Sequence, residues 1–335
     1  MIRIGIIGFG YWGPNILRNF SQQSDVAVSW VCDINPKTTT LVEKQYPGVR
    51  VTPNASDIFA DSTCDAVVIV TPISTHFALA KKALEFGKHV LVEKPMTQTT
   101  SESEELITIA AKKKKMLMVD HTFLYTPAVK EIKKIIASKK LGDILHIDCV
   151  RTNLGLLQKD SNVIYDLATH DLSIIDYLFN CSPSSVSASG VTLKGTSQET
   201  VAYMNASYPN GMHVHAHVSW ISPVKVRKIT FVGSKKMLVY DDMEPTEKIK
   251  IYDKSISLIS DPHAQHQLRV GYRIGSTIAP HIDVAEGLTG MVQAFIKSIK
   301  TNTPPPSDGI QGKRIVHMLE SATTSIRNTG ASVVL

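Results

Sequence analysis

Three side chains of the 335-residue sequence have the types and spacing that acid–base chemistry needs: Lys94, Asp166 and His170. Asp166 and His170 are four residues apart in a stretch with helical periodicity, so they share one face and can act on one substrate group. Histidine has a pKa suited to taking a proton from a hydroxyl group. The spacing also fits two metal ligands, but without a clear third ligand we favour acid–base chemistry. A purely structural histidine is the other alternative.

Lys94 lies in Glu93-Lys94-Pro95, directly after an apolar strand pattern. Ligands of parallel sheets bind beyond the carboxyl ends of the strands, so Lys94 should point toward the reacting groups. An ammonium there lowers the cost of negative charge on a substrate oxygen. The alternative is an exposed, solvated lysine. Together the three residues predict a dehydrogenase site in which His170 takes the hydroxyl proton, Lys94 polarises the oxygen and Asp166 orients the group or the substrate.

A glycine-rich turn near the N-terminus predicts a dinucleotide site. The run from Gly8 through Gly10 to Gly13 fits G-x-G-x-x-G between a strand and a helix start, where Pro14 begins the helix. A helix N-terminus there would bind the pyrophosphate. Asp33 follows the second strand, where its carboxylate can bind ribose hydroxyls. No arginine follows it to hold a 2′-phosphate, which favours NAD over NADP. The alternative is that these residues merely build turns.

The elements that must position these residues alternate in type along the first 122 residues. The strand patterns are Arg3–Gly8, Val26–Asp33, Ala66–Thr71, His89–Glu93 and Met116–Asp120. The helical patterns between them are Pro14–Gln22, Pro36–Tyr46, Thr75–Phe86 and Thr100–Lys114. This alternation predicts an α/β fold with a doubly wound parallel sheet, a Rossmann domain over residues 1–122.

The order of strand and helix patterns changes after residue 122, which predicts a second, α+β domain over residues 123–335. Helical patterns at Pro127–Ser138 and Val163–Phe179 flank a strand at Ile144–Thr152. Strand patterns then follow one another from Ser184 to Ile251, which indicates an open, largely antiparallel sheet. Two helices, Val284–Lys300 and Asp308–Asn328, close the chain. We expect this domain to bind substrate and to mediate oligomerisation.

Bulk composition narrows the class of protein. The net charge of +6 is spread along the chain and modestly favours anionic ligands, so nucleic-acid binding is a weak hypothesis. The four cysteines are scattered, which fits reduced thiols better than disulfides or a zinc site. No membrane span and no secretory signal are visible, so we expect a cytoplasmic protein.

Two further patterns have alternative interpretations. His213, His215 and His217 alternate along a strand and project to one face, where a subunit partner or substrate is favoured over a metal. Lys225 and Arg227 share a strand face and could meet a diphosphate, although a solvated face is the more common role. We predict no metal.

The sequence resembles the Gfo/Idh/MocA family of sugar oxidoreductases over nearly its whole length. The motifs that carry the resemblance are Gly8–Gly13, Thr71-Pro72 with Thr75-His76, Glu93-Lys94-Pro95, Asp166 with His170, and Pro305–Gly309. The resemblance implies that Lys94, Asp166 and His170 line the active site. It also implies a homodimer or homotetramer formed through the open sheet. The implied cofactor-binding residues are Gly8, Gly10, Tyr11, Trp12, Gly13, Asp33, Thr71, Pro72, His76, Glu93 and Lys94.

Within that family, three stretches resemble members that act at C3 of nucleotide-linked sugars. These stretches are Gly10–Asn15, His121–Tyr125, and Arg151–Asn153 with Asn162–Asp166. Tyr165 stands where many relatives have tryptophan. The implied substrate-binding residues are Lys94, Tyr125, Arg151, Asn153, Asn162, Tyr165, Asp166 and His170.

We therefore predict an NAD(P)-dependent dehydrogenase, or reductase in the reverse direction, acting on a secondary hydroxyl, at C3 of a nucleotide-linked hexose such as a UDP-N-acetylhexosamine. One alternative is a dehydrogenase of a free polyol such as inositol. The other is a regulator that binds the dinucleotide without turnover. Retention of Lys94, Asp166 and His170 argues against a regulator, which needs none of them.

Overall fold

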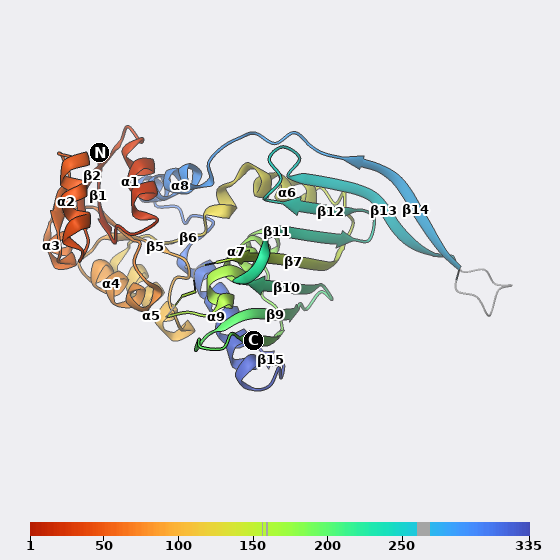
Figure 1. The fold of residues 1–335 in the computed structure, drawn as a ribbon. Coiled ribbons are helices and arrows are strands. Elements are labelled where there is room, and N and C mark those ends of the chain that lie inside the picture. Colours follow the sequence, from red (N-terminus) through yellow and green to blue (C-terminus); the bar gives the residue numbers. More distant parts are fainter. Residues whose placement is uncertain (156, 159, 260–268) are drawn as a thin grey trace. The chain divides into compact units, whose positions relative to one another are not determined.

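The protein folds into two compact units, each built from three separate segments (Figure 1). A computed structural model describes residues 1–155, 157–158, 160–259 and 269–335, and only the backbone of 255–259 and 269–273. Unit 1 contains Met1–Thr126, Gln158–Tyr177 and Ala285–Glu320. Unit 2 contains Pro127–Leu157, Leu178–Val284 and Ser321–Leu335. The chain therefore returns to unit 1 twice after leaving it, and the division at residues 122 and 123 stays a prediction from the sequence.

Unit 1 is built on a six-stranded parallel sheet of order β3-β2-β1-β4-β5-β6. Its strands are β1 Ile2–Ile7, β2 Val26–Cys32, β3 Arg50–Thr52, β4 Ala66–Ile69, β5 His89–Glu93 and β6 Leu117–Asp120. The order reverses between β1 and β4, which is where doubly wound sheets bind ligands. The predicted Rossmann fold is confirmed.

Helices connect and follow these strands. They are α1 Gly13–Ser21, α2 Pro36–Gln45, α3 Ala55–Ala60, α4 Ile73–Glu85, α5 Thr100–Lys113, the 3₁₀ turn η1 Thr122–Tyr125, the π-helical turn η2 Ile164–Ala168, α7 Thr169–Phe179, α8 Gly287–Thr301 and α9 Gly309–Arg327. The sequence patterns did not predict β3 and α3, because segments this short carry little periodicity. Of the helices in the described residues, none is long and apolar enough to cross a bilayer.

The sheet of unit 1 is buried on both faces. All four residues of β4 are buried, and β1 buries five of its six. One face packs against α3, α4 and α5 in a cluster that includes Ile58, Leu84 and Leu106. The other face meets α1 and α8, where Phe20 and Phe295 pack edge to face. The central strands read as continuous Val/Ile runs because helices cover both faces of the sheet.

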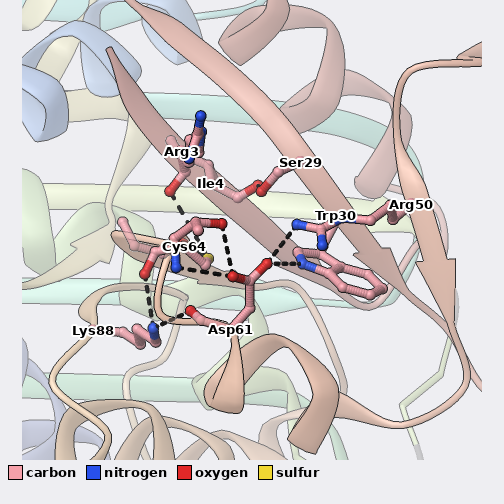
Figure 2. Close-up of polar contacts among 10 residues, drawn as sticks. Arg3, Ile4, Ser29, Trp30, Arg50, Asp61, Cys64 and Lys88 are labelled. Carbon is pink, nitrogen blue, oxygen red and sulfur yellow. Dashed lines mark hydrogen bonds and ion pairs between the residues drawn. The ribbon is translucent and has the colours of Figure 1, made fainter.

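A polar network near the amino ends of β1 and β4 fixes the loop between α3 and β4 (Figure 2). Lys88 is buried and donates to the carbonyl oxygens of Asp61 and Cys64 at 2.6 and 2.8 Å. The Asp61 carboxylate accepts from the Trp30 indole at 2.8 Å and from Arg50, whose guanidinium lies 4.1 Å from the Trp30 ring. These bonds lower the pKa of Asp61. The network lies at the sheet edge opposite the expected ligand site.

Unit 2 contains a nine-stranded sheet of order β14-β13-β12-β11-β7-β10-β9-β8-β15. Its strands are β7 Ile144–Leu154, β8 Ser185–Thr192, β9 Glu199–Ser207, β10 His213–Ser219, β11 Ile221–Gly233, β12 Met237–Asp241, β13 Ile249–Ile259, β14 Arg269–Ile278 and β15 Val333–Val334. Helix α6 Pro127–Ala137 precedes β7. All pairs are antiparallel except β7 with β10, which confirms the predicted largely antiparallel sheet.

One face of the unit 2 sheet is more exposed than the other. Along β10, Val214, Ala216 and Val218 are buried. His213 and His215 alternate with them on the other face, where Nδ1 of His215 donates a hydrogen bond to the Asp148 carboxylate at 2.7 Å. Tyr203 stacks on His217 with ring centroids 4.6 Å apart. This alternation is the pattern of a sheet with one open face.

Candidate active site

The glycine turn between β1 and α1 is tightly packed at its ends. Gly8 has a φ of +90°, and a Cβ there would lie 2.5 Å from the carbonyl oxygen of Val70. A Cβ on Gly13 would lie 2.9 Å from the Phe9 ring. Only glycine permits both the positive φ of the turn and the close approach of α1 to the strand. The turn therefore brings the start of α1 to the carboxyl edge of the sheet.

The middle of the turn is open. A Cβ on Gly10 would meet no atom of the described residues within 4 Å. The residue that precedes α1, Trp12, makes no side-chain cap bond, and the first turn of α1 has no acidic residue. Tyr11 and Trp12 expose 85% and 47% of their surface. An uncapped, unshielded helix N-terminus next to free space fits a diphosphate, because its N–H groups and partial positive charge attract anions.

Asp33 ties this turn to the end of β2. One carboxylate oxygen accepts from the Phe9 amide at 2.7 Å, and the other accepts from the Asn35 amide at 2.8 Å. Each oxygen retains a second acceptor site for a ribose hydroxyl. The sequence placed Asp33 at this position. The structure adds that its orientation is fixed by backbone amides on both sides.

His76, predicted with Thr71 and Pro72 to lie beside the cofactor, joins two loops of the carboxyl edge. Its Nε2 lies 2.8 Å from the carbonyl oxygen of Thr71, and its Nδ1 lies 2.9 Å from that of Pro95. The ring is buried, and burial lowers its pKa. This geometry gives His76 the task of holding the loop after β4 against the loop after β5. Thr71 also accepts a hydrogen bond from Thr75.

Lys94 and Asp166 meet directly, although they are far apart in sequence. The Lys94 ammonium donates to the Asp166 carboxylate at 2.9 Å and to the Asp166 carbonyl oxygen at 3.0 Å. The two side chains are 14% and 24% exposed, so the ion pair is open at one side. It joins the end of β5 to the η2 turn within unit 1. Two bonds to one residue hold the ammonium in a defined orientation.

His170 lies one turn beyond this pair, in the first turn of α7. Its ring packs edge-on against Phe123, with centroids 5.1 Å apart. Phe123 belongs to η1, directly after β6, so His170 also lies near the carboxyl edge of the sheet. The sequence pattern predicted one helix over Val163–Phe179. In the structure this helix begins with the π-helical turn η2, which contains Asp166, and continues as α7, which contains His170.

The remaining predicted residues of unit 1, Tyr165, Asn162 and Tyr125, form hydrogen bonds within the unit. Tyr165 donates from its hydroxyl to the carbonyl oxygen of Gln98 at 2.8 Å, and its amide donates to Asn162 at 3.1 Å. Tyr125 is buried with its hydroxyl 2.8 Å from that of Ser307, and burial raises its pKa. The Ser307 backbone in turn bonds Val119 of β6, so the predicted Pro305–Gly309 segment lies along that strand.

The predicted residues Arg151 and Asn153 belong to β7 of unit 2. Arg151 is buried and pairs in register with Arg227 of β11. Arg227 itself forms an ion pair with Asp242 at 3.3 Å. Within unit 1, the described geometry therefore brings Lys94, Asp166 and His170 to one edge of the sheet.

Two buried residues of this edge, Asp120 and His121, were not among the predicted site residues, although His121 begins the stretch His121–Tyr125 that carries the resemblance to sugar-nucleotide enzymes. Asp120 ends β6 and His121 follows it. Strand β6 pairs with β5, which Lys94 follows. Burial and the charge of Lys94 lower the pKa of His121 to about 3. An acid at the carboxyl end of a buried parallel strand was the available signal, because such positions face the ligand site.

The doubly wound sheet, the open glycine turn and the lysine at the end of β5 define a dinucleotide-dependent oxidoreductase. Comparison with known proteins agrees. Residues 2–121 match the NAD-binding Rossmann domain of the Gfo/Idh/MocA oxidoreductases, and residues 129–239 match their C-terminal domain. The chain belongs to the Gfo/Idh/MocA family, and its cofactor is NAD.

Individual relatives extend the match over most of the chain. UDP-N-acetylglucosamine 3-dehydrogenase of Acidithiobacillus ferrooxidans is 26% identical over 318 residues, 94% of each protein. A solved structure of that enzyme matches with a TM-score of 0.82 at 25% identity and covers 98% of both chains. The uncharacterised oxidoreductase YdgJ of Escherichia coli is 31% identical over 263 residues, 74% of this chain and 73% of that protein. Inositol 2-dehydrogenase of Rhodococcus jostii is 28% identical over 189 residues, 55% and 52% of the two chains.

Proposed function

We propose that the protein transfers hydride between NAD and C3 of a nucleotide-linked hexose of the UDP-N-acetylhexosamine type. The observation that carries the proposal is the Lys94–Asp166 pair at the end of β5, with His170 one turn further along the chain. When bound, NAD accepts the hydride in one direction and, reduced, supplies it in the other. The protein's own residues handle the proton.

In this proposal His170 takes the proton of the C3 hydroxyl as the carbon–hydrogen bond breaks. A lysine ammonium has three donors, and two of those of Lys94 are used by Asp166. The third is left to bind the substrate oxygen and to stabilise its developing negative charge. Asp166 holds the ammonium in place. In the reverse direction His170 returns the proton to the oxygen of the ketosugar.

The choice of substrate class rests on two supports. The Acidithiobacillus enzyme that matches 94% of this chain is named for oxidation at C3 of UDP-N-acetylglucosamine. The net charge of +6 also favours an anionic substrate such as a sugar nucleotide. A free polyol such as inositol is the second candidate, supported by the inositol 2-dehydrogenase similarity over about half of the chain.

A substrate panel tests the proposal. Purified protein with NAD is offered UDP-N-acetylglucosamine, UDP-N-acetylgalactosamine, UDP-glucose and myo-inositol, and formation of NADH is followed by absorbance. We expect turnover with a UDP-N-acetylhexosamine and a 3-keto product by mass spectrometry and NMR. Turnover of inositol with none of the UDP-sugars would replace the sugar-nucleotide proposal by the polyol one.

Cytoplasmic location and assembly into a dimer or tetramer remain predictions. The scattered cysteines, all four of which are free, support the first. The half-exposed face of the unit 2 sheet supports the second. Sedimentation of the purified protein tests the assembly.

A further inference from the structure

Two carboxyl groups, the partly buried Glu93 and the buried Asp120, lie on neighbouring strands at the carboxyl edge of unit 1. Glu93 ends β5 and Asp120 ends β6, and the two are register partners on neighbouring parallel strands. Register partners of neighbouring strands point to the same face of a sheet. Asp120 is 6% exposed and accepts a hydrogen bond from the Thr122 hydroxyl. We call these two residues the carboxyl pair.

The carboxyl pair holds one negative charge. Burial raises the pKa of both groups, and the neighbouring Asp120 raises that of Glu93 further. Two neighbouring carboxylates with little access to water repel each other, so one retains its proton near neutral pH. The Thr122 hydroxyl stabilises the ionised form of Asp120, which places the proton on Glu93.

The groups around the carboxyl pair do not neutralise this charge. Among the described residues, the positive charge of Lys94 acts on both carboxyl groups. Lys94 already forms an ion pair with Asp166. Burial keeps His121 uncharged and raises the pKa of Tyr125, so both are neutral. His121 is 1% exposed, and neither ring nitrogen has a hydrogen-bond partner among the described residues. The edge therefore carries an excess of negative charge beside an unsatisfied polar ring.

The sheet order predicts that the nicotinamide half of a bound dinucleotide would lie at this edge. The glycine turn after β1 would hold the pyrophosphate, and Asp33 after β2 would hold the adenosine ribose. The other half of the dinucleotide must then lie on the opposite side of the β1–β4 switch point, beyond β4, β5 and β6. The nicotinamide ring carries a positive charge when oxidised and none when reduced.

We propose that the carboxyl pair stabilises the charged ring of NAD+ and so makes the protein bind NAD+ more tightly, relative to NADH, than it otherwise would. Asp120 is then a positioning residue, because it acts on the nicotinamide ring through the negative charge of the carboxyl pair. This inference rests on the proposed placement of the cofactor and on no property of the sugar.

The test measures the ratio of the Kd of NADH to the Kd of NAD+, because any general loss of cofactor binding cancels in that ratio. In neutral buffer, Glu93 of the wild type is mostly protonated and Asp120 mostly ionised, so Glu93→Gln leaves the charge of the pair and the ratio at their wild-type values. In the double variant Glu93→Gln/Asp120→Asn the pair carries no negative charge. Its ratio falls about tenfold, as expected when one charge near the nicotinamide ring is removed from a protein interior. Glu105→Gln, an exposed acid on α5 paired with Lys81, is the control and leaves the ratio unchanged.

An unchanged ratio in the double variant overturns the inference, and so does an equal fall in Glu93→Gln alone. If the double variant does not fold, the variant Asp166→Asn/His170→Asn is titrated to acid pH. Protonation of the carboxyl pair then lowers the ratio without any contribution from the Asp166 carboxylate or the His170 imidazole, and a ratio independent of pH overturns the inference. Failure of the sugar panel leaves these measurements untouched, because they use no substrate.

Discussion

At the scale of single residues, the candidate active site at the carboxyl edge of the unit 1 sheet depends on side chains whose orientation is fixed by other residues. Lys94 is oriented by two acceptors of Asp166, and Asp33 by two backbone amides. His76 fixes the loop that carries Pro95. Such second contacts place reactive groups before a ligand binds, which lowers the cost of organising them in the transition state.

Replacement of His170 by alanine tests the proton transfer. We expect kcat to fall by about 10²-fold or more, since no other described side chain has been assigned to take the hydroxyl proton. NAD binding should survive, because the glycine turn and Asp33 are untouched. Steady-state kinetics and a fluorescence titration with NADH measure the two effects. His281→Ala, at a highly exposed histidine, is the control. Wild-type kcat in His170→Ala would remove the residue from the mechanism.

At the scale of elements, two local conformations create the site. The π-helical turn Ile164–Ala168 presents the carbonyl oxygen of Asp166 to Lys94 ahead of α7. The turn after β1 brings α1 to the sheet edge through a glycine with φ of +90°. Neither conformation follows from helical or strand periodicity. Such departures from regular geometry occur frequently at functional sites.

Gly8→Ala tests the turn after β1. The added methyl would lie 2.5 Å from the Val70 carbonyl oxygen, and alanine disfavours the positive φ. We expect the free energy of unfolding to fall by about 1–3 kcal/mol and the affinity for NAD to drop. Urea denaturation and calorimetric titration measure these quantities. Gly48→Ala is the matched control, because a Cβ there meets no described atom within 4 Å. Equal stability of both variants would contradict the packing described for Gly8.

At the scale of the whole molecule, the chain folds into two discontinuous units. Residues 158–177, which carry Asp166 and His170, cluster with the Rossmann segment although they follow β7 of unit 2 in sequence. Part of the C-terminal region, from Ala285 to Glu320, does the same. The catalytic candidates therefore all belong to the unit that holds the dinucleotide site.

Hydrogen exchange with and without NAD tests this division. A ligand that binds only the folded state protects the segments it contacts or orders. We expect the largest gain in protection at residues 8–16, 70–76 and 93–97, and little change in β9 and β10. Mass-spectrometric peptide mapping reports both regions in one sample. Equal protection of β9 and β10 would show that the cofactor acts well beyond unit 1.

The sequence by itself determined the Rossmann unit, because strand and helix periodicities, glycine spacing and Asp33 are local features. It also identified Lys94, Asp166 and His170 by motif. Tertiary structure alone decided that Lys94 bonds both the carbonyl and the carboxylate of Asp166, and that Glu93 lies beside Asp120. Contacts between residues tens of positions apart depend on sheet order and helix packing, and no local pattern encodes the burial that sets their charge.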